Sequence, residues 1–163
     1  MKKIKLALSW LVVSAVMILI FCLSAQVADD SSELSEGFIS GIYRFYLKLT
    51  EIPCSTTEFD NTVLSLQFIA RKSAHFCIYA ALGFLFSNAY FQTGITIFSK
   101  NIIISGISSI IYAITDEVHQ LFVEGRSCEL RDVFIDSIGS ITGILVFVLI
   151  MLIWRKKWIL QKP

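Results

Sequence analysis

The sequence predicts an all-α integral membrane protein: a bundle of four transmembrane helices with an amphipathic helix in a long first extracellular loop. Three observations lead to this fold class. Hydrophobic residues make up 55% of the 163 residues, and only 17% are charged. The charged residues are clustered, and long apolar runs separate the clusters. Eight glycines and two prolines are too few to indicate a disordered chain.

Four apolar segments are long enough to cross a bilayer, whose hydrocarbon core requires a helix of about 20 residues. The predicted spans are residues 6–25, 74–91, 102–118 and 133–154. The first exceeds the apolar stretch of an ordinary signal peptide, so we interpret it as an uncleaved anchor. Trp10 and Trp154 lie near span ends, where aromatic rings favour the membrane interface. We expect residues 1–163 to form a single membrane domain.

The long loop over residues 27–71 contains apolar residues at helical spacing: Leu34, Phe38, Ile42, Phe45 and Leu49. This spacing predicts an amphipathic helix of about four turns. Two interpretations of the helix remain open. It could pack on the outer ends of the spans, or it could lie in the outer leaflet. The first is favoured because the polar face is not strongly basic.

The basic residues predict the orientation of the spans, because cytoplasmic loops are enriched in lysine and arginine. With both termini in the cytoplasm, eight basic residues are inside: Lys2, Lys3, Lys5, Lys100, Arg155, Lys156, Lys157 and Lys162. All thirteen acidic residues then lie outside or at the outer ends of spans. The four cysteines form no CxxC motif. Cys54 and Cys128 would share the outer side, either as two thiols, which we favour, or as a disulfide.

Polar residues fall near the outer end of every predicted span. Arg71, His75 and Tyr79 are four residues apart and therefore share one helix face. The other spans and the last loop supply further polar residues at the same depth: Ser24, Gln26, Lys72, Asp116, Glu117, Gln120, Arg126, Asp132 and Asp136. Since an unpaired charge in hydrocarbon is costly, we expect one cluster facing the bundle interior. In it, Arg71, Lys72 and Arg126 could neutralise the carboxylates.

Several roles for this cluster are open. Ion networks of this kind can serve helix assembly alone. Alternatively, His75 with Asp116 or Glu117 could form a general acid–base pair. A metal site that adds His119 is chemically possible, but we expect none. A serine hydrolase using Ser24 or Ser73 would lack the GxSxG motif.

Small residues predict where the helices pack closely. Gly139 and Gly143 form a GxxxG motif in the last span. Gly106, Ser109 and Ala113 are expected to form a small-residue stripe that leads to Asp116.

These residues resemble the motifs of the VanZ-like family. Residues 21–26, FCLSAQ, are similar to its F-x-x-S-x-Q motif, and residues 71–83 match R-K-x-x-H-F-x-x-Y-x-x-L-G. Residues 116–122, DEVHQLF, resemble D-E-x-x-Q-x-F. Gly125 and Arg126, followed by Asp132, Asp136 and the two glycines of the last span, complete the pattern. Glu124 departs from it, because proline is common there in the family.

The resemblance implies a multi-pass protein of the bacterial plasma membrane, with a link to glycopeptide resistance, particularly to teicoplanin. It implies no cofactor and no established activity. Together with the predicted cluster, it leads us to expect an outward-facing pocket. The expected partners are the lipid bilayer and a lipid head group, a lipid-linked wall precursor or a lipid-bearing glycopeptide. A net charge of +1 gives no reason to expect nucleic acid. A membrane enzyme and a purely structural bundle remain alternatives.

Overall fold

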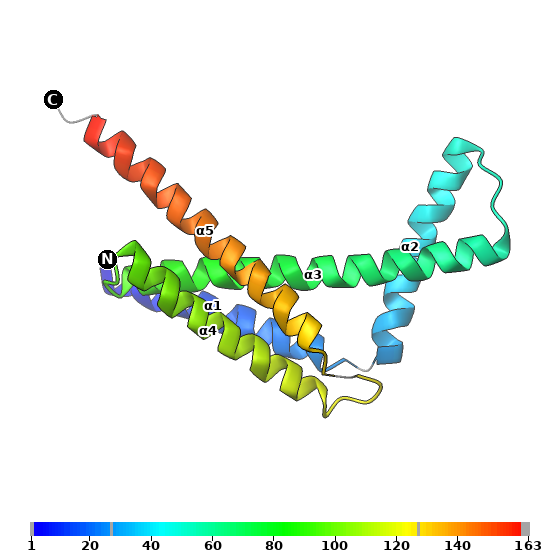
Figure 1. Ribbon diagram of the computed structural model, residues 1–163, viewed down its shortest axis with the longest axis horizontal. Coiled ribbons are helices and arrows are strands. Elements are labelled where there is room, and N and C mark those ends of the chain that lie inside the picture. The colour runs from blue at the N-terminus through cyan, green and yellow to red at the C-terminus, as the bar shows by residue number, and fades with distance from the viewer. Residues whose placement is uncertain (1, 27, 127, 161–163) are drawn as a thin grey trace.

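The protein is a bundle of long helices, seen in a computed structural model that describes residues 2–26, 28–126 and 128–160 (Figure 1). The helices are α1 (Lys2–Ser24), α2 (Ala28–Thr50), α3 (Thr56–Gln92), α4 (Phe98–Gln120) and α5 (Leu130–Leu160). Four of them, α1, α3, α4 and α5, are long and apolar enough to cross a membrane. The predicted fold class, a four-span helical membrane protein with an additional helix in the first loop, is therefore confirmed.

Helix α3 is the centre of the bundle and packs against each of the other four helices. It is much longer than the predicted span 74–91, because it already begins at Thr56. A capping box starts it: the Ser55 hydroxyl accepts from the backbone N–H of Glu58, and the Glu58 carboxylate accepts from the N–H of Ser55. Its 37 residues correspond to about 55 Å, well over the roughly 30 Å of a hydrocarbon core.

Helix α5 crosses α3 at very short range, as the diagonal ribbon in Figure 1 shows. Three glycines permit this approach. A Cβ atom at Gly143 would overlap the carbonyl oxygen of Ala80, and one at Gly139 would overlap that of Phe76. A Cβ atom at Gly83 would overlap the carbonyl of Ser140 in the same way. The GxxxG motif thus lies in the α3–α5 contact, where backbone meets backbone.

Helix α4 buries a polar stripe rather than the predicted small-residue stripe. Ser109 and Ala113 are fully buried, but a Cβ atom at Gly106 would meet open space. Ser105, rather than Gly106, lies on the buried face of α4. It is four residues before Ser109 and therefore shares its face of the helix. The side-chain amide of Asn101 donates to the carbonyl of Ser87 on α3 at 3.0 Å.

Helix α2 is the predicted amphipathic helix, and it packs against α3. Within the described part of the chain, its helix contacts are with α3, which it crosses (Figure 1). Tyr43 packs on Phe59 of α3, with 5.4 Å between ring centroids. The opposite apolar face stays open, since the side chains of Phe38, Ile42, Phe45 and Leu49 are all more than half exposed. The fifth residue of the predicted stripe, Leu34, lies outside the described side chains, as do Lys156, Lys157 and Lys162.

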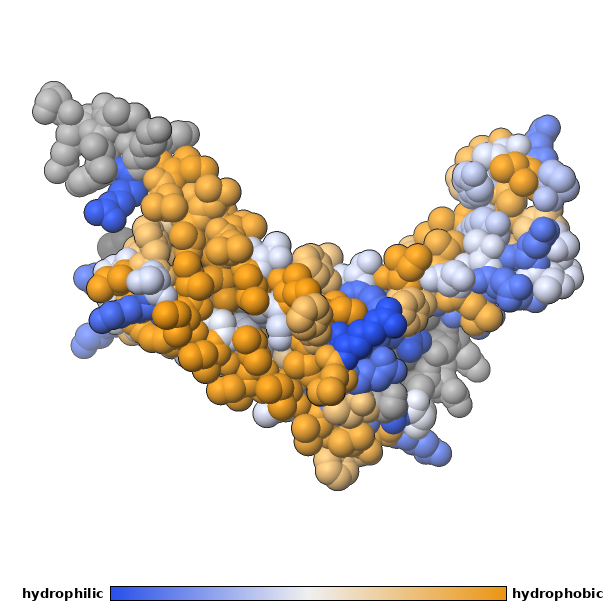
Figure 2. All heavy atoms as spheres, in the orientation of Figure 1, coloured by the Kyte–Doolittle hydropathy of each residue, from blue (hydrophilic) through white to orange (hydrophobic). Residues whose placement is uncertain are grey.

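The surface of the bundle is apolar, as expected for a protein that lies in a lipid bilayer (Figure 2). Large hydrophobic side chains such as Leu11, Ile107 and Leu149 are more than half exposed on three different spans. The buried apolar core of the bundle contains Val13, Tyr79, Leu82 and Ala113. All four cysteines are free, so Cys54 and Cys128 are two thiols.

Candidate functional site

Polar side chains gather at one end of the bundle, which we call the junction end. There α1 and α4 end and α5 begins, while α3 continues past them. Residues that the sequence spreads over more than 100 positions contact one another at this level. They fall into three buried contact groups and one open pocket.

The first group surrounds Asp116, whose side chain is 2% exposed. The Ser24 hydroxyl at the end of α1 donates to the Oδ2 atom of Asp116 at 2.9 Å. The Tyr79 hydroxyl of α3 donates to the same oxygen at 3.2 Å. Asp116 therefore joins α1, α3 and α4 through hydrogen bonds from two uncharged donors.

The second group holds the connection from α4 to α5. The buried Glu117 accepts from the side-chain amide of Gln120 at 3.3 Å and from the backbone N–H of Glu129 at 3.0 Å. These contacts fix the loop that carries Arg126. Glu117 thereby links α4 to the backbone that leads into α5.

The third group connects α3 to α5. Lys72 forms an ion pair with Asp132, and both side chains are 17% exposed. One turn further along both helices, the Nδ1 atom of His75 lies 3.6 Å from the Oδ1 atom of Asp136. Asp136 is completely buried, and among the described residues neither of its carboxylate oxygens has a hydrogen-bond partner. Of the carboxylates, Asp136 is thus the one paired with His75, where Asp116 or Glu117 was expected.

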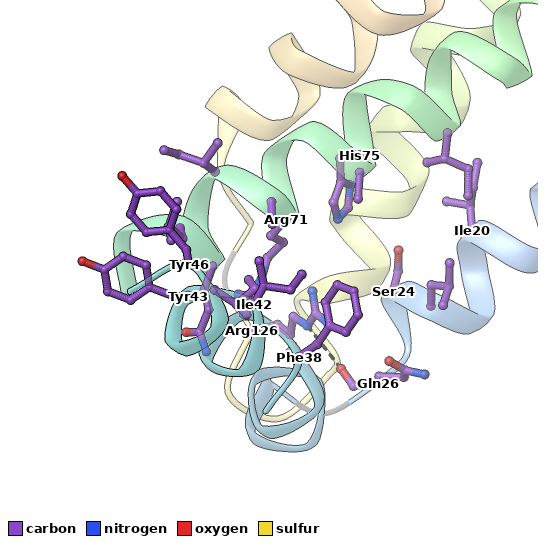
Figure 3. Close-up of a pocket in the computed structure, with 18 residues that line it drawn as sticks. Ile20, Ser24, Gln26, Phe38, Ile42, Tyr43, Tyr46, Arg71, His75 and Arg126 are labelled. Atoms are coloured by element: carbon purple, nitrogen blue, oxygen red, sulfur yellow. Dashed lines mark hydrogen bonds between the residues drawn. The ribbon is translucent and has the colours of Figure 1, made fainter. Parts of the chain in front are cut away.

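The pocket at the junction end has a volume of about 810 Å³ and lies between α1, α2 and α3 (Figure 3). Its walls are mainly apolar, and they include Ile20 of α1, Ile78 of α3 and, from α2, Phe38, Ile39 and Ile42. Polar side chains enter it from three elements: Ser24, Gln26, Gln67, Arg71, His75 and Arg126. The pocket thus combines an extended apolar wall with a small polar region.

Two arginines give the polar region a positive character. Arg71 shares one face of α3 with His75, and Arg126 reaches in from the loop after α4 (Figure 3). The Nε–H of Arg126 donates to the backbone carbonyl of Gln26 at 3.2 Å. Burial lowers the pKa of Arg126 below its usual range and the nearby charge of Arg71 lowers it further, while the carboxylates of Asp116 and Glu117 oppose this shift. An anion placed between the two guanidinium groups would relieve this repulsion.

The structure divides the predicted polar residues into two sets. Five line the pocket: Ser24, Gln26, Arg71, His75 and Arg126. The other seven lie in the contact groups behind it: Lys72, Tyr79, Asp116, Glu117, Gln120, Asp132 and Asp136. His119 stacks on Phe21 instead of joining His75, with 4.1 Å between ring centroids. Within the described residues, no three histidine, cysteine or acidic side chains form a group that could hold a metal ion.

The side of the pocket formed by α2 was not predicted from the sequence. Phe38, Ile42, Tyr43 and Tyr46 line the pocket, although they lie in the segment without a recognisable motif. The signal was present in the amphipathic spacing of this segment. What it could not give was the direction in which the apolar face points.

Comparison with protein-family models relates the chain to a known family. The family model described as VanZ/LLP1 matches residues 9–153, which is most of the chain. None of the curated proteins matches. No solved structure matches either.

Proposed function

The chain belongs to the VanZ/LLP1 family, and we propose that it is a bacterial envelope protein whose junction-end pocket binds an anionic lipid. One observation carries the proposal: apolar walls and two arginines line the same cavity of about 810 Å³. A lipid has this same division, with an apolar chain attached to a charged head group. The protein is a multi-pass membrane protein, so such ligands are present at high local concentration.

The residues suggest how a lipid would lie. The lipid chain would rest between α2 and α3, where Phe38, Ile42 and Ile69 line the pocket. The anionic group would meet Arg71 and Arg126, whose guanidinium groups favour planar pairs of hydrogen bonds to carboxylate or phosphate. Binding there would place a negative charge beside both guanidinium groups.

The pocket would face the outside of the cell. The distribution of lysine and arginine supports this orientation, because both chain ends are basic and Lys100 lies in the first turn of α4. In Figure 1 the beginning of α1 lies far from the junction end. With the termini in the cytoplasm, the junction end is at the outer leaflet. The plausible ligands there are an anionic head group, a lipid-linked wall precursor and an acylated glycopeptide.

A contribution to teicoplanin resistance follows from this location. Teicoplanin carries an acyl chain that places it at the outer leaflet, whereas vancomycin lacks such a chain. A pocket at this depth could bind the acylated drug or the lipid-linked precursor that the drug targets. The family membership supports this role.

Binding of a lipid to the purified protein tests the proposal directly. We would measure binding of fluorescent phosphatidic acid and of a fluorescent zwitterionic phosphatidylcholine to the protein in detergent micelles. We expect tighter binding of the anionic lipid, and a loss of at least tenfold in affinity for Arg71→Ala. Arg131→Ala is the matched control, since Arg131 lies over the ring of Phe68, outside the pocket. Equal affinity of wild type and Arg71→Ala for both lipids would disprove the proposal.

A further inference from the structure

Asp136 differs from the other carboxylates of the junction end in having no hydrogen bond. Asp132 is paired with Lys72, and Glu117 accepts from Gln120 and from the Glu129 backbone. Asp136 is fully buried, and among the described residues neither of its oxygens is hydrogen-bonded. A buried carboxylate left in this state is expensive, and native proteins keep such groups when they serve a purpose.

Among the described residues, Asp136 forms an ion-pair contact with His75. The Nδ1 atom of the imidazole is buried and lies 3.6 Å from the carboxylate. This distance is longer than a hydrogen bond, but pairs of this kind often tighten only when a ligand is bound. The His75 side chain lines the pocket and remains 23% exposed. A proton shared between Nδ1 and Asp136 would leave Nε2 as a base directed at the pocket.

The surroundings of His75 match the requirements of hydrolysis. Arg71 and Arg126 lie in the same pocket and could hold an anionic group beside the imidazole. The hydroxyl of Ser24, which also lines the pocket, already donates to Asp116 at 2.9 Å. This favours water, rather than a serine nucleophile, as the attacking group. Two guanidinium groups favour a phosphate over a neutral carboxylic ester as the reacting group.

We infer that His75 is a general base, positioned by Asp136, for hydrolysis of a lipid phosphomonoester held in the pocket. This inference rests on the proposed lipid-binding function. The Nε2 atom takes a proton from a water molecule while the water oxygen bonds to phosphorus. The bond between phosphorus and the lipid oxygen breaks, and its electron pair leaves with that oxygen. The lipid oxygen takes a proton from solvent, and His75 returns its proton to solvent. One water is consumed, and a lipid alcohol and inorganic phosphate are formed.

Release of inorganic phosphate by the purified full-length protein in detergent micelles tests this inference. Two probes distinguish the lipid carriers of the phosphate: dioleoyl phosphatidic acid and a long-chain polyprenyl monophosphate. We expect release from at least one probe, and a loss of about 100-fold or more for His75→Gln, the usual range for removing a general base. His119→Gln is the matched control. It changes the other histidine, which stacks on Phe21 outside the pocket.

Asp136→Asn tests the positioning role separately. We expect a lower kcat at an unchanged KM and an unchanged amount of monodisperse protein. A residue that serves folding alone would lower the amount of protein and leave kcat per folded molecule unchanged. Phosphate release that is the same in wild type and His75→Gln would overturn the inference, as would no release from either probe.

The binding measurement keeps this result apart from the proposed function. Wild-type protein that binds phosphatidic acid through Arg71 but releases no phosphate would be a lipid-binding protein without this activity. In that case the inference fails and the proposed function stands. Protein that neither binds nor hydrolyses the lipid would contradict both.

Discussion

The Ser24 hydroxyl donates a hydrogen bond of 2.9 Å to Asp116, and this bond joins the end of α1 to α4 across 92 positions of sequence. Both side chains are almost completely buried. The contact lies directly behind the pocket, which Ser24 itself lines. The stability of the bundle and the shape of the pocket therefore depend on the same pair of residues.

Replacing Asp116 should destabilise the bundle more than replacing Ser24. Asp116→Ala leaves the hydroxyls of Ser24 and Tyr79 buried without their acceptor, at a cost of about 1–3 kcal/mol each. Ser24→Ala removes a single donor and should cost about 1 kcal/mol. Unfolding of the purified proteins in mixed micelles with increasing denaturing detergent measures the difference. Equal stability of both variants would show that Asp116 contributes no more than this one bond.

Gly143→Ala should weaken the α3–α5 crossing. The added Cβ atom would overlap the carbonyl oxygen of Ala80, so the helices must separate. We expect a loss of about 1–3 kcal/mol, as for other overpacked sites. Gly106→Ala is the control, because a Cβ atom there meets open space, and alanine favours a helix over glycine by about 1 kcal/mol. The same unfolding measurement compares them, and a stable Gly143→Ala protein would contradict the packing.

The proposed orientation predicts which cysteines react from outside the cell. Cys54 and Cys128 lie in the connections at and beyond the junction end, and both are free thiols. On intact cells both should react with a membrane-impermeant maleimide. A cysteine introduced by Lys100→Cys, in the α3–α4 hairpin region, should react only after permeabilisation. The reverse pattern would place the pocket on the cytoplasmic side.

The open face of α2 should contact lipid. Phe45 and Leu49 are 64% and 68% exposed, and a large apolar surface of this kind favours the membrane interface. An environment-sensitive fluorophore at Phe45→Cys, in a variant without the native cysteines, should be quenched by brominated lipids in proteoliposomes. The same fluorophore at Lys48→Cys, on the polar side of the helix, should be quenched much less. Equal quenching at both positions would argue against an interfacial helix.

Overexpression should raise resistance to teicoplanin more than to vancomycin if the pocket acts at the outer leaflet. Arg71→Ala should remove the effect in protein that still reaches the membrane, whereas Arg131→Ala should retain it. Minimum inhibitory concentrations, with membrane levels checked by immunoblot, provide the measurement. Equal shifts for both drugs would indicate a general change of the wall, and no shift would reject the resistance role.

Much of the architecture could be read from local patterns. The four spans follow from apolar length, and the face shared by Arg71, His75 and Tyr79 follows from helical spacing. The GxxxG motif correctly indicated a close helix contact. These features depend on the identity and spacing of residues along one helix, which the sequence gives directly.

Other features could not be obtained in this way. Gly106 and Ser105 are neighbours in sequence, yet Ser105 is buried and Gly106 meets open space. The extension of α3 before the predicted span 74–91 was missed, because residues 56–73 contain many polar side chains and so do not look like a membrane span. The open face of α2 depends on which of its two apolar sides meets α3.

The sequence by itself determined the class of the protein, the number of its spans and the residues that gather at one depth. Only the tertiary structure decided which of them meet: His75 with Asp136, Lys72 with Asp132, and Asp116 with Ser24 and Tyr79. The physical reason is that spacing fixes the depth and face of a side chain on its own helix. How far each helix is rotated toward its neighbours is set by packing, here by the glycines that bring α5 against the backbone of α3.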